Sequence, residues 1–380
     1  MALRTVQNWL RRAGEEALSA VDWSTHRRTP KRRPRQIDPA LERRVCLLRK
    51  ELERESALGF VGAQAIHDAL CAERPRASLP SPRTINRILR RNGLLDGKAR
   101  VRRPAPGRGW YLPSVAAAQG ELDSFDVVED LRMEGRGLFQ VFTARALWGS
   151  AVGAWLALVA STDFVLTALE VFWRKHGLPA FAQFDNDVRF QGGHNHPDVI
   201  GRVMRLCLSL GVTPVFAPPL ETGFQAAIEN FNGLWQRKVW ERFHHETLET
   251  FSAVSERFTE AYSRRLDRLL NPEHHPERRP FPSPWSLDLQ CPPRGRVIYL
   301  RRTDQSGTVK LLGHRFSLDP LWPHRLARCE VDFDREQIDC FRRRRRAPDD
   351  QPLIVSLPYQ LPRRRFDTRP RHKHPVTTIS

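Results

Sequence analysis

Apolar residues recur at helical spacing in the first hundred residues of the chain. The pattern predicts three helices, which begin near residues 38, 62 and 81. Asp38-Pro39 and Ser81-Pro82 each join a capping side chain to a proline in the first helical turn, which is typical of a helix start. Together the three helices indicate a small helical domain.

From about residue 120 the pattern changes to apolar runs that alternate with helical segments. Alternation of this kind is typical of a mixed α/β sheet. A break is expected within the long helix that carries Glu229. Strands are predicted near 120–128, over 138–141 and 153–159, up to Asp185 and over 212–217, and helices over 162–176, 199–210 and from about 224 toward 270.

The stretch from 294 to 345 contains short apolar alternations divided by turn residues. They predict five strands, and strands of this length and spacing favour a small β-barrel. The residues after 346 are basic and rich in proline, and we expect them to be disordered. The five strands are expected at 297–300, 308–312, 314–318, 329–333 and 337–341.

These patterns divide the 380 residues into modules. No run of apolar residues is long enough to span a membrane, and no secretory signal is evident. We therefore expect a cytoplasmic, nucleoid-associated protein without a membrane partner. The expected divisions are a partial helix-turn-helix at 1–23, a basic linker at 24–37, a helix-turn-helix domain at 38–95, a linker at 96–119, an α/β core at 120–270, a linker at 271–293, a β-barrel at 294–345 and a tail at 346–380.

Charge is distributed unevenly over a chain whose net charge is +19. Residues 1–110 carry 25 Lys and Arg against 11 Asp and Glu, residues 111–293 carry 17 against 22, and residues 294–380 carry 20 against 10. Basic flanks around an acidic centre are typical of DNA-binding modules beside a carboxylate site. Arginine richness from a GC-rich genome remains an alternative, although it would not leave the centre acidic.

The helix that begins at Ser81-Pro82 has one apolar side and one arginine-rich side. A helix, a turn and a second helix with a basic outer face favour a helix-turn-helix that reads DNA. A packing domain with solvated arginines is the alternative. Residues 4–12 also look like the second helix of such a motif without its upstream partner, so we expect a truncated module or an earlier start. The arginines expected to contact DNA are Arg83, Arg87, Arg90 and Arg91.

Three acidic residues stand where the predicted elements end or begin. Asp126 lies in the first predicted strand, Asp185 ends a later one, and Glu229 lies near the start of a long helix. Two aspartates on strands and a glutamate on a helix can share a pair of divalent ions that hold the attacking and leaving oxygens of a phosphoryl displacement. In so basic a chain the polyanion is expected to be DNA.

Two stretches carry a resemblance to a known family. The segments HGLPAFAQFDND, at 176–187, and LGVTPVFAPPLETGFQAAIENFN, at 210–232, resemble the integrase core of insertion-sequence transposases of the DDE type, in the retroviral integrase superfamily. The resemblance implies an α/β RNase H-like mixed-sheet core, with helix-turn-helix modules before it and a small β-barrel after it. It also implies that Asp126, Asp185 and Glu229 are the catalytic metal ligands.

Other acids compete for the aspartate roles. Asp123 and Asp130 lie beside Asp126, but only Asp126 has the flanking hydrophobic residues of the family pattern. Asp187 competes with Asp185, and the Asp-Asn pair at the end of the strand selects Asp185.

Glu221 competes with Glu229 for the third role. A common family spacing places 35 residues between the second and third acids, which counts to Glu221. Glu221 nevertheless directly follows Leu220 in a Pro-Pro-Leu loop, whereas Glu229 lies on the helix. The insertion at 192–198 accounts for the extra residues, so Glu229 is preferred.

The resemblance further implies two Mg²⁺ or Mn²⁺ ions, and carboxylate oxygens are suitable ligands for either metal. DNA element ends and target DNA are the expected partners, held by a homo-oligomer, and the expected reaction is 3′-end cleavage followed by strand transfer. Arg237 and Lys238, on the same helix as Glu229, are candidates for contacting DNA ends. A catalytically inactive DNA-binding remnant or regulator, and a general nuclease, stay open as alternatives.

Overall fold

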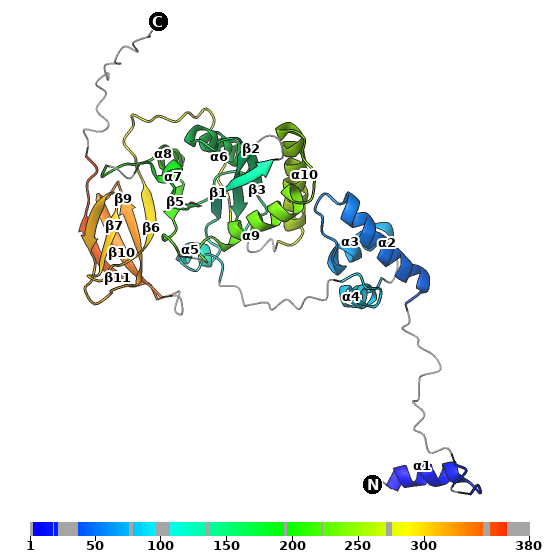
Figure 1. Cartoon of the computed structure of the whole chain (residues 1–380). Coiled ribbons are helices and arrows are strands. Elements are labelled where there is room, and N and C mark those ends of the chain that lie inside the picture. The colour runs from blue at the N-terminus through cyan, green and yellow to red at the C-terminus, as the bar shows by residue number, and fades with distance from the viewer. Residues whose placement is uncertain are drawn as a thin grey trace. The chain divides into compact units, whose positions relative to one another are not determined.

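Figure 1 shows the computed structural model of the chain as a ribbon. Its residues fall into two compact units, one of 1–54 with 60–97 and the other of 55–59 with 98–380. Each unit is described by itself below. The described residues are 3–17, 19–21, 37–75, 79–95, 107–133, 137–193, 196–221, 223–270, 276–344 and 350–362.

The first unit contains a three-helix bundle at the positions that the apolar spacing predicts. Its helices pack around buried aliphatic side chains that include Val45, Ile66 and Leu89. The Ser81 hydroxyl caps the third helix by accepting from the Thr84 amide at 3.4 Å. The bundle helices are α2 (Pro39–Glu55), α3 (Ala63–Glu73) and α4 (Pro82–Arg91), and α1 (Leu3–Ala13) precedes them.

The second unit is built on a mixed sheet of nine strands in the order β11-β10-β9-β6-β5-β4-β1-β2-β3. β1, β4, β5 and β6 pair in parallel, and the other neighbours pair antiparallel. Such a sheet is compatible with an RNase H-like core. The strands are β1 (Leu122–Met133), β2 (Gly137–Ala146), β3 (Val152–Ala157), β4 (Phe181–Phe184), β5 (Thr213–Phe216), β6 (Arg296–Arg302), β9 (Leu326–Asp332), β10 (Gln337–Arg343) and β11 (Leu353–Pro358).

Helices cover both faces of the β1–β5 part of the sheet. Because side chains alternate across a strand, Phe142 and Ala144 of β2 pack with one helical layer, and Phe139 and Val141 pack with the other. The predicted break in the Glu229 helix is present at 241–247. The first layer holds α6 (Thr162–His176), α7 (Val188–Gln191) and α8 (Arg202–Ser209), and the second holds α9 (Ala226–Trp235), the π-helical turn η1 (Gln236–Trp240) and α10 (Leu248–Asp267).

The five C-terminal strands form where they were expected, but a closed barrel is not confirmed. β6, β9 and β10 extend the core sheet instead, because β6 pairs with β5 through Val215–Ile298 and Phe216–Tyr299. β7 (Thr308–Leu311) and β8 (His314–Ser317) form a separate hairpin that packs its apolar side on this extension. The core and the C-terminal strands therefore share one unit.

Part of the expected disordered tail is ordered. β11 lies within the stretch that was expected to be disordered from 346, and it pairs antiparallel with β10. In this pairing Ser356 lies opposite Asp339, and the Ser356 hydroxyl donates a hydrogen bond to the Asp339 carboxylate at 2.6 Å. Residues 345–349 and 363–380 lie outside the described residues, as do 22–36 of the first basic linker.

The described end of the second expected linker packs on the sheet. A short helix, α5 (Pro113–Ala116), follows Trp110 and Tyr111, and these residues are buried against β6 and β9. The Tyr111 hydroxyl donates to Gln183 at 2.8 Å and to the Phe224 carbonyl at 2.9 Å. Residues 107–119 are therefore part of the core.

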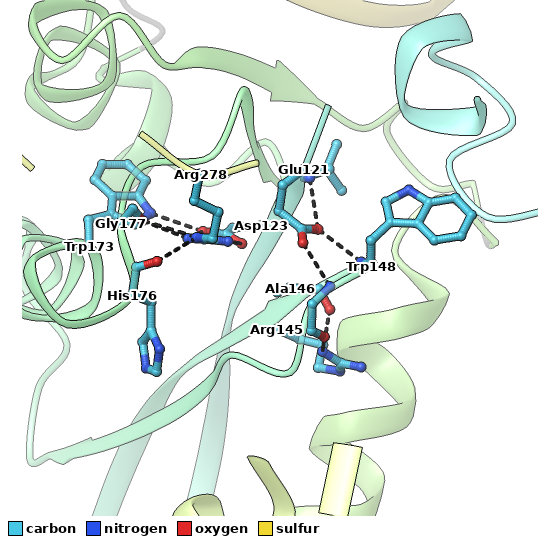
Figure 2. Close-up of polar contacts among 11 residues, drawn as sticks. Glu121, Asp123, Arg145, Ala146, Trp148, Trp173, His176, Gly177 and Arg278 are labelled. Atoms are coloured by element: carbon cyan, nitrogen blue, oxygen red, sulfur yellow. Dashed lines mark hydrogen bonds and ion pairs between the residues drawn. The ribbon is translucent and has the colours of Figure 1, made fainter. Parts of the chain in front are cut away.

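The third expected linker also contacts the core, through Arg278. Its guanidinium donates two hydrogen bonds, of 2.8 and 2.7 Å, to the carboxylate of Asp123, whose side chain is completely buried (Figure 2). Trp173 donates to the same carboxylate at 3.1 Å, and Arg278 also donates to the carbonyls of His176 and Gly177. This strap of 276–285 thus joins α6 to the start of β1.

No helix in the described ranges is both long enough and apolar enough to cross a membrane.

Removal of Arg278 should be costly because it leaves a buried carboxylate without its partner. We expect Arg278→Met to lower the free energy of unfolding by about 3–5 kcal/mol. Arg264→Met, which breaks an exposed ion pair on α10, should cost less than about 1 kcal/mol.

Chemical denaturation followed by tryptophan fluorescence measures both values. The double variant Asp123→Asn/Arg278→Met should recover part of the loss, because no buried charge then remains unpaired. If Arg278→Met and Arg264→Met lower the free energy of unfolding equally, the buried ion pair of Arg278 with Asp123 does not stabilise the fold as predicted.

Candidate functional site

The parallel pairing of β1 and β4 places two of the expected acids on neighbouring strands. Ser124 of β1 lies opposite Gln183 of β4, and both strands run in the same direction. Asp126 and Asp185 each follow two residues later, at the carboxyl side of the paired segment. Their side chains therefore reach the same edge of the sheet, which is where parallel sheets form ligand sites.

Helix α9 contacts this edge through Asn232. The Asn232 amide donates to Oδ2 of Asp126 at 2.7 Å, and its Oδ1 accepts from the hydroxyl of Thr143 at 2.7 Å. Thr143 is the β2 partner of Asp126 in the strand register. Glu229 precedes Asn232 by three residues, so it lies on the same side of α9. The Glu229 side chain is exposed.

The charges of Asp185 and Glu229 act on the carboxyl group of Asp126. Burial, and after it the negative charges of Asp185 and Glu229, raise the pKa of Asp126 to about 7, although hydrogen bonds from the Val127 amide and Asn232 oppose the rise. Burial also raises the pKa of Asp185, and the charge of Asp187 adds to this effect. The arrangement therefore stores a repulsion that a cation would relieve.

The three carboxylates have the oxygen ligands that a hard divalent cation prefers, but their side chains do not converge on one point. Among the residues that the structure describes, no three His, Cys, Asp or Glu side chains converge closely enough to hold a metal ion. Asp126 and Asp185 could hold an ion, and Glu229 could join them if its exposed side chain turned inward.

The rival aspartates each have a different environment. Asp123 is the buried partner of Arg278, on the strap side of the sheet. Asp187 caps α7 by accepting from the Arg189 amide at 2.7 Å and pairs with the Arg189 guanidinium at 2.6 Å. Asp130 is exposed, at a residue of positive φ within the irregular part of β1. Contacts therefore give Asp123 and Asp187 structural roles, whereas Asp130 lies exposed in an irregular part of the strand.

Glu221 lies in the loop before α9 and pairs with Arg302 of β6 at 2.7 Å. Glu229 forms no ion pair with a described residue, and its negative charge acts on Asp126. The structure therefore brings Asp126, Asp185 and Glu229 into one neighbourhood and holds Glu221 in an ion pair.

The basic residues expected to contact DNA fall into two groups. Arg83, Arg87 and Arg90 are exposed on α4, at positions that share one face. Arg91 is also exposed but pairs with Glu42 of α2 at 2.5 Å. These residues remain candidates for phosphate contacts, with Arg91 the least available.

In the second unit, Arg237 is exposed. Lys238 donates to the carbonyl of Gly59 at 2.8 Å and is partly buried, so its ammonium group already has a structural contact.

Sequence patterns missed two parts of the site. Asn232 orients Asp126, and the spacing of three residues from Glu229 is the signal that could have identified it. Asn186 was treated only as a marker for Asp185, yet its Oδ1 accepts from Gln191 at 2.5 Å and from Arg301 at 2.9 Å. Its amide donates to the Ala217 carbonyl at 2.7 Å. The role of Arg301 depends on how β6 joins the sheet, which has no local signal.

The chain matches no known family model and no curated protein. Among solved structures, it is similar to a chain of the simian T-cell lymphotropic virus intasome in complex with PP2A regulatory subunit B56 gamma, with 13% identity, a TM-score of 0.33, and coverage of 70% of this chain and 88% of that one. It is also similar to the catalytic core domain of BIV integrase, with 17% identity, a TM-score of 0.25, and coverage of 37% and 80%. At these TM-scores neither likeness decides the function.

The raised pKa of Asp126 predicts a pH-dependent stability in the absence of divalent ions. The folded state holds this proton up to about pH 7, whereas the unfolded chain releases it near the ordinary value of 3.8. The stability that protonated Asp126 contributes to the folded state is therefore intact at low pH. It is lost as the pH rises from 3.8 to about 7. Relative to Asp126→Asn, the wild type should lose on the order of 1–2 kcal/mol between pH 5 and 8.

Urea unfolding in a chelating buffer at several pH values measures this difference, because other groups cancel between the two proteins. Glu256→Gln, which removes an exposed acid of α10, is the control for the loss of one negative charge. Parallel stability curves for wild type and Asp126→Asn would contradict the prediction.

Proposed function

We propose that this protein is a DDE-type transposase that cleaves DNA at the 3′ ends of an element and joins them to target DNA. The observation that carries the proposal is that parallel pairing of β1 and β4 places Asp126 and Asp185 at one edge of the sheet, where the charges of Asp185 and Glu229 act on Asp126. Acids on two parallel strands and one helix supply the oxygen ligands that phosphoryl transfer requires.

In this proposal each residue has a separate task. Asp126, Asp185 and Glu229 would hold Mg²⁺ or Mn²⁺ ions through their carboxylate oxygens. When bound, the ions would neutralise charge on the phosphodiester and favour ionisation of the attacking hydroxyl. Asn232 holds the Asp126 carboxylate in one orientation through its 2.7 Å hydrogen bond, as outer residues of metal sites commonly do.

The reaction has two displacements at the same carboxylates. Water first hydrolyses the phosphodiester at the element end, which leaves a free 3′-OH. That hydroxyl then displaces a 3′ oxygen from a phosphodiester of the target, so one bond breaks as one forms. The second displacement is a transesterification and needs no external energy source.

The charge distribution supports DNA as the substrate. Residues 1–110 carry a net charge of +14 and residues 294–380 one of +10, whereas residues 111–293 carry −5. Arg83, Arg87 and Arg90 line an exposed face of α4, and we propose that this helix binds DNA with its arginine face. By the same proposal the active form is a homo-oligomer that holds two element ends.

Strand transfer with labelled DNA from the boundaries of the source locus, in Mg²⁺ or Mn²⁺, tests the proposal. Wild type should give joined products, and Glu229→Gln should reduce them by more than about 100-fold, because loss of even an outer residue of a metal site costs 10–100-fold. Glu221→Gln is the matched control, since it removes the same group from the neighbouring loop, and it should stay within a few-fold of wild type.

The outcomes separate the alternatives. DNA binding without nicking or joining by wild type would favour the inactive remnant or regulator. Cleavage of unrelated duplex as efficiently as of boundary DNA would favour a general nuclease. Loss of joining in Glu221→Gln with retention in Glu229→Gln would transfer the third role to Glu221.

A further inference from the structure

A hollow of about 480 Å³ begins beside Asn186, the residue that follows Asp185. One wall comes from the segment after β4, and the other comes from β6 and the β7–β8 hairpin. The hollow therefore joins the catalytic edge of the sheet to its C-terminal extension. Residues from both walls include Asn186, Gly192, Gly193, Arg301, Lys310 and Gly313.

Arg301 brings a fixed positive charge to this hollow. Its guanidinium donates to Oδ1 of Asn186 at 2.9 Å and to the carbonyl of Ala217 at 3.3 Å, and it lies 4.9 Å above the ring of Tyr299. These acceptors are neutral, and no carboxylate among the described residues pairs with Arg301. Burial lowers the pKa of Arg301, which is the effect of a charge without a counterion.

Lys310 adds a second charge from the other wall. Its side chain is exposed on β7, and no described carboxylate forms an ion pair with it. Arg302, also in the wall, is neutralised by Glu221 at 2.7 Å. The hollow thus carries two positive charges that form no ion pair with a described carboxylate, and it is of a size to admit a phosphate group.

The chain around Gly192 and Gly193 leaves this wall open to a close approach. Gly192 has a φ of +90°, which favours glycine, and a Cβ there would lie 2.8 Å from the Val199 side chain. No atom of the described residues, apart from the chain neighbours of Gly193, lies within 4 Å of a Cβ built on Gly193. The backbone at Gly193 is therefore accessible to a ligand.

We propose that this hollow binds a backbone phosphate of the DNA strand whose neighbouring phosphodiester lies at Asp185. The inference rests on the proposed function because it takes DNA as the ligand. It does not depend on the cleavage and joining reactions. Arg301 and Lys310 contact the phosphate, and Arg301 is also a positioning residue, because it holds Asn186 next to Asp185. Contacts of this kind are independent of base sequence.

Lysine footprinting of the full-length protein tests this site without any catalytic step. An amine-acylating reagent is applied with and without a duplex that carries a 3′ overhang, in a buffer free of divalent ions, and modified lysines are located by mass spectrometry. Lys310 should be protected by DNA. Lys175, exposed near the end of α6 beside the strap, is the internal control and should not be protected.

The matched substitutions Lys310→Gln and Lys175→Gln give a second readout. Each phosphate contact contributes about 0.9 to the slope of log affinity against log salt concentration. Lys310→Gln should therefore reduce the slope by about that amount, and Lys175→Gln should leave it unchanged.

DNA binding with Lys310 unprotected and with an unchanged slope in Lys310→Gln would overturn the inference and leave the proposed function intact. Absence of DNA binding by wild type would overturn both. Inorganic phosphate in place of DNA distinguishes the source of the anion: equal protection of Lys310 at the same phosphate concentration would mean a free-phosphate site and would contradict a nucleic-acid site.

Discussion

Parallel pairing of β1 with β4 brings two carboxylates to one edge of a sheet whose interior excludes water. Asp126 is then mostly buried, and the charges of Asp185 and Glu229 act on it, so its pKa rises to about 7. The other features of the site respond to this crowding. Asn232 donates to Asp126, the Val127 amide donates to it as well, and the exposed side chain of Glu229 lies at the margin.

The C-terminal strands are part of the same architecture. β6 continues the sheet beside β5, which brings Arg301 to Asn186 and Arg302 to Glu221. The edge that carries Asp126 and Asp185 therefore has neighbours from a segment more than 70 residues beyond Glu229 in the chain. This continuity is the physical reason why the proposed DNA contacts come from both the core and the extension.

Local patterns predicted the elements well and their assembly less well. Ser161 and Gly177 bound a helix predicted at 162–176, and the structure has α6 over the same residues, because capping and termination are local properties. The barrel was not confirmed because strand partners are chosen across the chain, and nothing near Ile298 indicates that it pairs with Val215. β11 was not predicted because its short apolar alternation lies within a strongly charged stretch of the chain.

The same distinction applies to the site. Asp185 and Glu229 lie in local contexts that a sequence displays, and the electrostatic effect on Asp126 agrees with their grouping. The ion pair of Asp123 with Arg278 and that of Glu221 with Arg302 join residues 155 and 81 positions apart, so no spacing rule could have predicted them. The assignment of catalytic and metal-binding roles stays a prediction.

The most direct test of the central claim is anomalous diffraction from crystals of the protein soaked with Mn²⁺. The account predicts a peak between the carboxylates of Asp126 and Asp185, with Glu229 turned toward it, and no peak at this position in crystals of Asp185→Asn. A peak bound by other residues, or none at the edge of β1 and β4 in wild-type crystals, would contradict the account.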